Sequence, residues 1–182
     1  AKAARVPAVV HTIHGVAFHE FQSGWRNRLY ISLERLCAPL SGRIVSVSQR
    51  LGEAAIGLGI GRPEQHTTVF SGIDLDLFLS VRARVSVEEA KGLAGIPPDA
   101  PVVGKIARLF PLKGHEQFLA AAVEISRQMP EVYFLLVGDG PLRDALKADA
   151  SRLGLGDRVV MVGRVLPEAV PQYIQAMDVV VH

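Results

Sequence analysis

The chain has 182 residues, of which 49% are hydrophobic, and its 20 basic and 18 acidic side chains leave a formal net charge of +2. A chain of this length and hydrophobicity buries a substantial core, which excludes an intrinsically disordered protein. Because the basic residues are scattered rather than gathered into a run, nucleic acid is not expected as a partner.

Cys37 is the sole cysteine, so neither a disulfide framework nor a cysteine-based metal site can be built, and we expect a reducing, cytoplasmic setting. The longest weakly charged stretch, residues 6–19, falls short of the ~18 apolar residues that a membrane helix needs. We also reject a zinc site at the first histidines, because His11 and His14 face opposite sides of a predicted strand. A globular protein without a resident metal is therefore expected.

In the first part of the chain, short β-branched stretches alternate with stretches of helical periodicity. The hydroxyl of Ser48 stands where it can cap a helix. The predicted elements are strands at 8–13, 43–48 and 66–70, helices at 27–40 and 49–58, and a turn at 71–74.

A linker is predicted from residue 76 to residue 101, broken by a helix at 87–93 that Ser86 caps. We place a domain boundary at 78/79. The later strands are apolar on both faces, which predicts a parallel sheet covered by helices, the α/β class. The predicted elements are strands at 102–107, 132–137, 159–162 and 178–181, and helices at 113–128, 142–153 and 168–176.

Arg108 and Lys113 follow the strand predicted at 102–107 and precede a helix. In a parallel sheet the ligand crevice lies beyond the carboxyl ends of the strands. A guanidinium fork, an ammonium group and the amino end of a helix suit an anion with several oxygens, so the pattern favours a diphosphate. The alternative is that both are ordinary solvated surface charges.

The next two strands also end in loops that could contribute to a site. Gly138 lets the backbone turn tightly or approach a ligand, although a plain strand-to-helix turn explains it as well. Gly163, Arg164 and Val165 could present backbone groups to a base, or form a simple connection. His14 ends the first strand, where an imidazole could act as an acid, a base or a hydrogen-bond donor, with a structural role as the alternative.

An aromatic and basic cluster lies between the first strand and the following helix. It could form a mobile loop on the acceptor side, a contact with a membrane surface, or a buried patch against that helix. The cluster consists of Phe18, Phe21, Trp25, Arg26, Arg28 and Tyr30.

Taken in order, several segments resemble family 4 of the retaining glycosyltransferases, in particular bacterial enzymes of polysaccharide and glycolipid assembly. The resemblance covers nearly the whole chain. It rests on HTIHG at 11–15, IVSVS at 44–48, SGID at 71–74, ARL at 107–109 with KG at 113–114, LVGDGP at 136–141 and VGRV at 162–165.

This resemblance implies a GT-B fold with parts of two Rossmann-like parallel-sheet domains. Residues 1–78 would be the C-terminal part of the acceptor-side domain, and residues 79–182 an incomplete donor-binding domain. Arg108 and Lys113 would bind the donor diphosphate. Gly138 and residues 163–165 would bind the nucleotide base, and His14 would approach the sugar as a catalytic group.

The implied reaction moves a sugar from a nucleotide diphosphate to an acceptor hydroxyl with retention at the anomeric carbon. The donor, linked to UDP, GDP or ADP, is a co-substrate, and neither a cofactor nor a metal is implied. The acceptor would be a glycan or a lipid-linked sugar, which allows peripheral membrane association.

Parts of the family pattern are absent at both ends of the chain, including the glutamate motif expected after residue 182. We therefore expect this chain to be inactive alone, and its open strand edges to favour dimerisation. Two other functions stay open at this point: a nucleotide-sugar epimerase of the same fold, and a non-catalytic nucleotide-binding or assembly fragment.

Overall fold

The computed structural model describes residues 4, 6–16 and 22–182, so Phe18 and Phe21 of the aromatic cluster lie outside the described residues. The chain divides into two units, residues 1–73 and 74–182, which are described separately. The boundary expected at 78/79 falls inside a helix of the second unit, α3 (Leu75–Arg84).

Unit 1 contains a parallel sheet of three short strands in the order β1-β2-β3. The strands are β1 (Val10–Ile13), β2 (Arg43–Ser46) and β3 (His66–Thr68). Val10 of β1 pairs with Arg43, and Ile44 of β2 pairs with His66. The core holds Ile13, Ile44 and Ile60. The elements therefore follow the predicted order, with strands two residues shorter than expected.

Two helices accompany this sheet. In α2 (Gln49–Gly57), the hydroxyl of Ser48 accepts a hydrogen bond from the amide of Leu51 at 3.2 Å, as the sequence predicts. The first helix, α1 (Gly24–Cys37), has no buried residue, which differs from the expected half-buried helix. Ile31 is partly buried, whereas the other large apolar side chains of the helix are exposed. They include Trp25, Leu29, Leu33 and Leu36.

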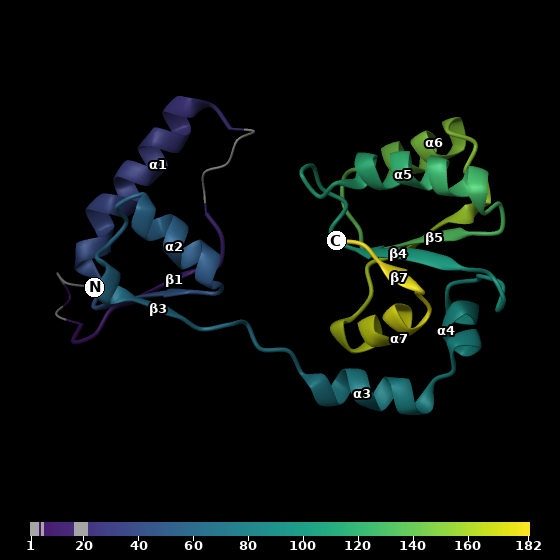
Figure 1. Cartoon of the computed structure of the whole chain (residues 1–182), viewed down its shortest axis with the longest axis horizontal. Helices are drawn as coiled ribbons and strands as arrows, with labels where there is room; N and C mark the ends of the chain where they lie inside the picture. The colour runs from purple at the N-terminus through teal and green to yellow at the C-terminus, as the bar shows by residue number, and fades with distance from the viewer. Residues whose placement is uncertain (1–3, 5, 17–21) are drawn as a thin grey trace. The chain divides into compact units, whose positions relative to one another are not determined.

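Unit 2 contains a second parallel sheet, in the order β6-β5-β4-β7. Helices α5 and α6 cover one face, while α4 and α7 lie on the other (Figure 1). The strands are β4 (Val102–Ile106), β5 (Tyr133–Val137), β6 (Val159–Gly163) and β7 (Val179–Val180). The helices are α4 (Val87–Leu93), α5 (His115–Gln128), α6 (Arg143–Arg152) and α7 (Val170–Gln175).

Strand β5 separates two hydrophobic cores, because successive side chains of a strand point to opposite faces. Phe134 and Leu136 enter the core below α5 and α6. Leu135 and Val137 enter the core that α4 and α7 cover. Phe134 meets Phe118 of α5 edge to face, with ring centroids 6.1 Å apart. The strand is apolar on both faces for this reason, and the expected α/β class is confirmed.

The prediction of a linker from residue 76 was wrong for its first part, where α3 forms. The carboxylate of Asp74 accepts a hydrogen bond from the amide of Leu77 at 3.2 Å and caps this helix. Helix α3 buries no residue completely and packs against α7. Its apolar residues follow no clear helical period, so the capping aspartate was the available signal.

A buried lysine fastens three elements at the amino end of this sheet. Nζ of Lys91, in α4, donates to the carbonyl oxygens of Ala100 at 2.9 Å and Pro98 at 3.2 Å. It also lies 3.7 Å from Oδ2 of Asp178, just before β7. The same carboxylate oxygen accepts the amide of Val102, the first residue of β4, at 2.7 Å. Lys91 and Asp178 thereby hold α4, β4 and β7 together.

Candidate functional site

Two cavities lie at this sheet: the loops after β4, β5 and β6 line one, and the loop after β4, helix α5 and the residues after β7 line much of the other. Both cavities have Ala107 in their walls, so they meet at the end of β4. This is the edge of a parallel sheet at which ligands bind.

The larger cavity has a volume of about 800 Å³ and receives residues from all three loops. It brings Arg108 together with Gly138, Arg164 and Val165. Gly163 is not part of its wall, because this residue is buried and its carbonyl oxygen accepts the amide of Gly138 at 2.9 Å. Four of the predicted site residues therefore line one cavity, and Gly163 contacts it through its hydrogen bond with Gly138.

Arg108 is exposed, and its guanidinium carbon lies 5.1 Å from the ring centroid of Phe110. This cation–π contact holds the side chain over an aromatic face without using its hydrogen-bond donors. Within the described part of the chain, no carboxylate pairs with Arg108. Its donors remain available to an anion entering the larger cavity.

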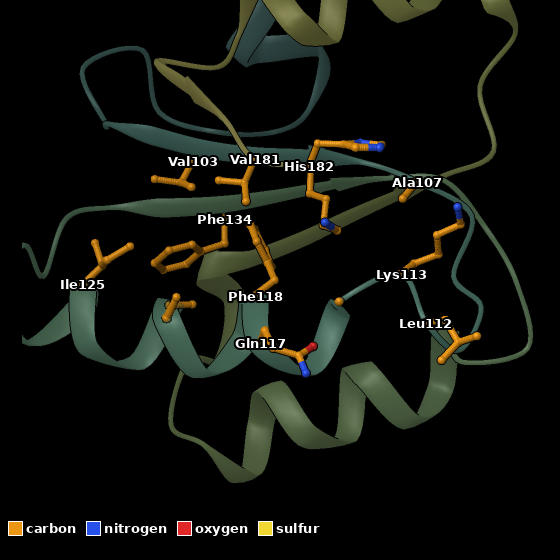
Figure 2. Close-up of a pocket in the computed structure, with 14 residues that line it drawn as sticks. Val103, Ala107, Leu112, Lys113, Gln117, Phe118, Ile125, Phe134, Val181 and His182 are labelled. Carbon is orange, nitrogen blue, oxygen red and sulfur yellow. The ribbon is translucent and has the colours of Figure 1, made fainter. Parts of the chain in front are cut away.

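Lys113 lines the other cavity, which has a volume of about 450 Å³. Figure 2 shows Leu112 and Lys113 on the loop before α5, with Gln117 on the helix itself and Val181 and His182 beyond β7. The structure thus places Arg108 and Lys113 in two adjoining cavities rather than one. A ligand that contacts both has to pass the end of β4 at Ala107.

The loops after β4 and β5 interlock through backbone contacts. The amide of Leu109, whose side chain is fully buried, donates to the carbonyl oxygen of Asp139 at 2.9 Å. A Cβ at Gly138 would overlap the carbonyl oxygen of Ala107, and one at Gly140 would overlap that of Leu109. Both glycines are required by the packing of one loop on the other, and Gly138 also lines the larger cavity, so its contact with a ligand stays a prediction.

His115 is a site residue that no sequence motif predicted. It is the first residue of α5, it is buried, and its Nε2 lies 2.9 Å from the carbonyl oxygen of Arg108. Because a carbonyl only accepts, Nε2 carries the proton. The imidazole therefore fixes the backbone from which Arg108 projects. Its place directly after Gly114, at a helix start, was the signal that could have identified it.

His14 lies in unit 1, directly after β1, and is exposed beside Gly15. Its approach to a sugar bound at unit 2 stays a prediction. In the part of the chain that the structure describes, no group of three histidine, cysteine or acidic residues could hold a metal ion. None of the described helices is long and apolar enough to cross a membrane.

Residues 86–182 match the model of the family described as glycosyl transferases group 1, and the chain belongs to this family. Over its full length it is 28% identical to the Escherichia coli UDP-Gal:alpha-D-GlcNAc-diphosphoundecaprenol alpha-1,3-galactosyltransferase, of which it covers 46%. Over 59% of its length it is 34% identical to the GDP-mannose-dependent alpha-(1-6)-phosphatidylinositol monomannoside mannosyltransferase of Mycolicibacterium smegmatis, of which it covers 28%.

Among solved structures, the chain resembles Anabaena Alr3699/HepE, crystallised with UDP and glucose, with a TM-score of 0.77 and 27% identity. The alignment covers all of this chain and 47% of that one. The chain thus spans about half the length, or less, of these relatives. The prediction of a glycosyltransferase and the GT-B-like fold class are confirmed, while the assignment to family 4 stays a prediction.

Proposed function

We propose that the protein to which this chain belongs is a retaining glycosyltransferase that moves a sugar from a nucleotide diphosphate to an acceptor hydroxyl. Unit 2 binds the donor in this proposal. The observation that carries it is the larger cavity at the carboxyl ends of β4, β5 and β6, where Arg108 faces Gly138, Arg164 and Val165. A guanidinium fork beside exposed backbone suits a phosphate group next to a base.

The donor would lie across both cavities. Arg108 and Lys113 would bind the diphosphate from either side of Ala107, because both cavities meet there. The base would lie against Gly138 and the loop at 163–165. His14, from unit 1, would approach the sugar. The role of each side chain is part of the proposal.

Negative charge grows on the diphosphate as it leaves the anomeric carbon. Arg108 and Lys113 would stabilise this charge more strongly in the transition state than in the bound donor. Removal of one such fixed donor from an active site typically costs about 3–4 kcal/mol of transition-state stabilisation. Loss of either cation should therefore slow transfer by the complete protein by about a hundredfold or more.

The names of the relatives support a choice of donors and a kind of acceptor. One relative uses UDP-galactose and another GDP-mannose, so the base is part of what has to be measured. The acceptors in these names are a sugar linked to diphosphoundecaprenol and a phosphatidylinositol monomannoside. We therefore extend the proposal to a glycan or lipid-linked acceptor and to a cytoplasmic protein with peripheral membrane contact.

Dimerisation is a separate part of the proposal. Val179 and Val180 of β7 are about half exposed, and β7 is the last strand on its side of the described sheet. An open apolar edge favours pairing with a second copy. Light scattering over a range of protein concentrations tests this: a constant monomer mass would contradict it.

Calorimetric titration with UDP, GDP and ADP tests the donor site directly. We expect one nucleotide to bind the wild-type chain and Arg108→Ala to weaken it by about tenfold or more, because a charged hydrogen bond is lost. Arg152→Ala is the matched control: this exposed arginine on α6 pairs with Asp149 and removes the same charge elsewhere. Absence of binding to the wild type, or an equal loss in both variants, would contradict the proposal.

A further inference from the structure

Lys105, in the middle of β4, is a buried lysine to which the sequence analysis gave no role. Only 4% of the residue is exposed. It is one of the residues that line the 450 Å³ cavity. Figure 2 shows Val103 and Ala107, which stand two residues before and after it, at the same cavity. Since alternate residues of a strand share a face, Lys105 projects from β4 on the side of α5.

Lys105 differs from the other buried lysine of this unit in having no partner. Lys91, which is 5% exposed, has two carbonyl oxygens and a carboxylate around its Nζ. Within the described residues, Nζ of Lys105 makes no hydrogen bond and no ion pair. Since its Nζ is not among the buried atoms that lack a partner, the ammonium group reaches the cavity, where it can donate to an anion.

The rest of the cavity is suited to the same charge. Lys113 and Gly114 stand in its wall, and α5, a helix of 14 residues, begins directly after Gly114. The first amides of a helix have no partner within it and carry the positive end of its dipole. No aspartate or glutamate is found among the described residues that line this cavity. The charged side chains in its wall, Lys105 and Lys113, are therefore both positive.

We propose that Lys105 is a further ligand of the donor diphosphate, with its Nζ donating to a phosphate oxygen inside the smaller cavity. This inference rests on the proposed function. Arg108 would hold the diphosphate from the larger cavity, and Lys105 with Lys113 would hold it from the smaller one. The ammonium group is a compact point charge with three donors, which suits a single phosphate oxygen in a cavity with apolar walls.

A bound phosphate accounts for a charged side chain on a strand that is otherwise apolar. Figure 2 shows Phe118, Ile125 and Phe134 at the other end of the same cavity. A phosphate oxygen bound against such walls is shielded from water, so its attraction to Lys105 is stronger than at an open surface. Lys105 would thus contribute more to affinity than an exposed lysine does.

The test compares Lys105→Met with Lys147→Met in the full chain. Lys147 is an exposed lysine on α6 and lies outside both cavities, so its loss removes the same formal charge. Inorganic pyrophosphate and UDP, GDP and ADP are titrated into each protein. We expect Lys105→Met to weaken pyrophosphate binding by about tenfold or more and Lys147→Met to change it less than twofold.

Two further measurements distinguish a loss of binding from a loss of folding. Methionine fills the volume of the lysine stem without an unpaired charge, so the midpoint of urea unfolding should stay equal or rise. In the wild-type protein, NMR of the lysine side chains should show a shift of the Lys105 signal on addition of pyrophosphate. Lys105→Gln provides a second variant that retains a polar end.

The outcomes separate this inference from the proposed function. If a nucleotide binds and Arg108→Ala weakens it while Lys105→Met does not, Lys105 is not a diphosphate ligand and the proposed function stands. If pyrophosphate binding depends on Lys105 but no nucleotide binds, the anion site is supported and the donor assignment fails. If neither pyrophosphate nor any nucleotide binds the wild type, both proposals fail.

Discussion

Nε2 of His115 donates to the carbonyl oxygen of Arg108 across 2.9 Å, so the first turn of α5 is tied to the loop that carries a proposed phosphate ligand. The second ring nitrogen, Nδ1, is buried without a partner. A buried nitrogen without a hydrogen bond lowers the stability of the fold. The hydrogen bond from Nε2 to the carbonyl oxygen of Arg108 offsets this cost. The loop geometry around Arg108 thus depends on a side chain outside the cavities.

His115→Ala should destabilise unit 2 and weaken nucleotide binding together. The substitution removes the donor to the Arg108 carbonyl and leaves a cavity, which together cost about 2–4 kcal/mol. A less ordered loop should then lower nucleotide affinity by several-fold. Urea unfolding followed by circular dichroism and calorimetric titration measure the two effects.

His66 offers the matched control in unit 1. Its Nε2 lies 2.8 Å from the carbonyl oxygen of Ile60, and its Nδ1 is likewise buried without a partner. His66→Ala should destabilise unit 1, which urea unfolding followed by circular dichroism measures. Equal loss of nucleotide affinity in both variants would sink the positioning role of His115.

Gly138→Ala should be among the most destabilising single-methyl changes in unit 2. Gly138 has φ +143°, a conformation that alanine adopts with strain, and the added Cβ would overlap the carbonyl oxygen of Ala107. We expect a loss of about 3 kcal/mol, from backbone strain and from separation of the two loops. Gly95→Ala, at φ +69° with open space around it, should cost only about 1 kcal/mol. Comparable unfolding midpoints for the two variants would contradict this account.

Lys91→Met should destabilise unit 2 by about 2–3 kcal/mol, because two carbonyl oxygens and Asp178 lose their partner. The side chain of Asp178 is 54% exposed and can bind water, which keeps the loss at or below the lower limit of the range for broken buried pairs. Lys147→Met, at an exposed position, should stay within ~0.5 kcal/mol of the wild type. Chemical denaturation at neutral pH gives both values.

Ser86→Ala should shorten α4 and change the titration of a neighbouring carboxyl. Ser86 and Glu89 form a reciprocal cap, with the amide of Glu89 donating to Oγ at 3.1 Å and the amide of Ser86 donating to Glu89 Oε2 at 2.8 Å. Its loss costs about 1 kcal/mol. The pKa of Glu88 is lowered from 4.5, chiefly by a hydrogen bond from its own backbone amide and next by one from Ser86. The variant should raise that pKa toward 4.5, as carboxyl NMR would show.

The sign of the pH effect follows from the direction of this shift. A carboxyl whose pKa is lower in the folded state stabilises the fold above its unfolded pKa, and that contribution disappears as the pH falls through the folded value. The wild type should therefore lose part of the stability of α4 on acidification from pH 4.5 downward, and Ser86→Ala should lose less. A larger loss in the variant would contradict the assignment.

The sequence predicted the order and type of most elements because apolar strands and caps are local signals. Ser48 and Ser86 cap their helices as predicted, and β5 is apolar on both faces because two cores enclose it. Helix α3 was not predicted, because it buries no side chain completely and its sequence therefore shows no apolar stripe. The exposure of α1 could not be predicted, because the sequence shows that a helix has an apolar face but not whether another element packs against it.

Most residues of the candidate site were predicted from the sequence, but their division between two cavities was not. Strand ends located Arg108, Gly138 and Val165 near one cavity. Spacing did not reveal that Lys113 faces the adjoining cavity, because the loop turns through Leu112 at φ +67° and Gly114 at φ +67°. The hydrogen bond from His115 to Arg108 could not be predicted, because it depends on the folded loop. The position of Lys105 at the smaller cavity, without a partner, could not be predicted for the same reason.

The contact between Asp178 and Val102 spans 76 positions of the sequence and has a consequence for the nascent chain. Strand β4 pairs with β5 on one edge, and its other edge is covered only when β7 has left the ribosome. At a synthesis rate of about 5–20 residues per second, the interval between the end of β4 and Asp178 lasts roughly 4–14 s. During those seconds the edge of a central strand is open to pairing with another chain, so translation speed and chaperone cover influence the yield of folded protein.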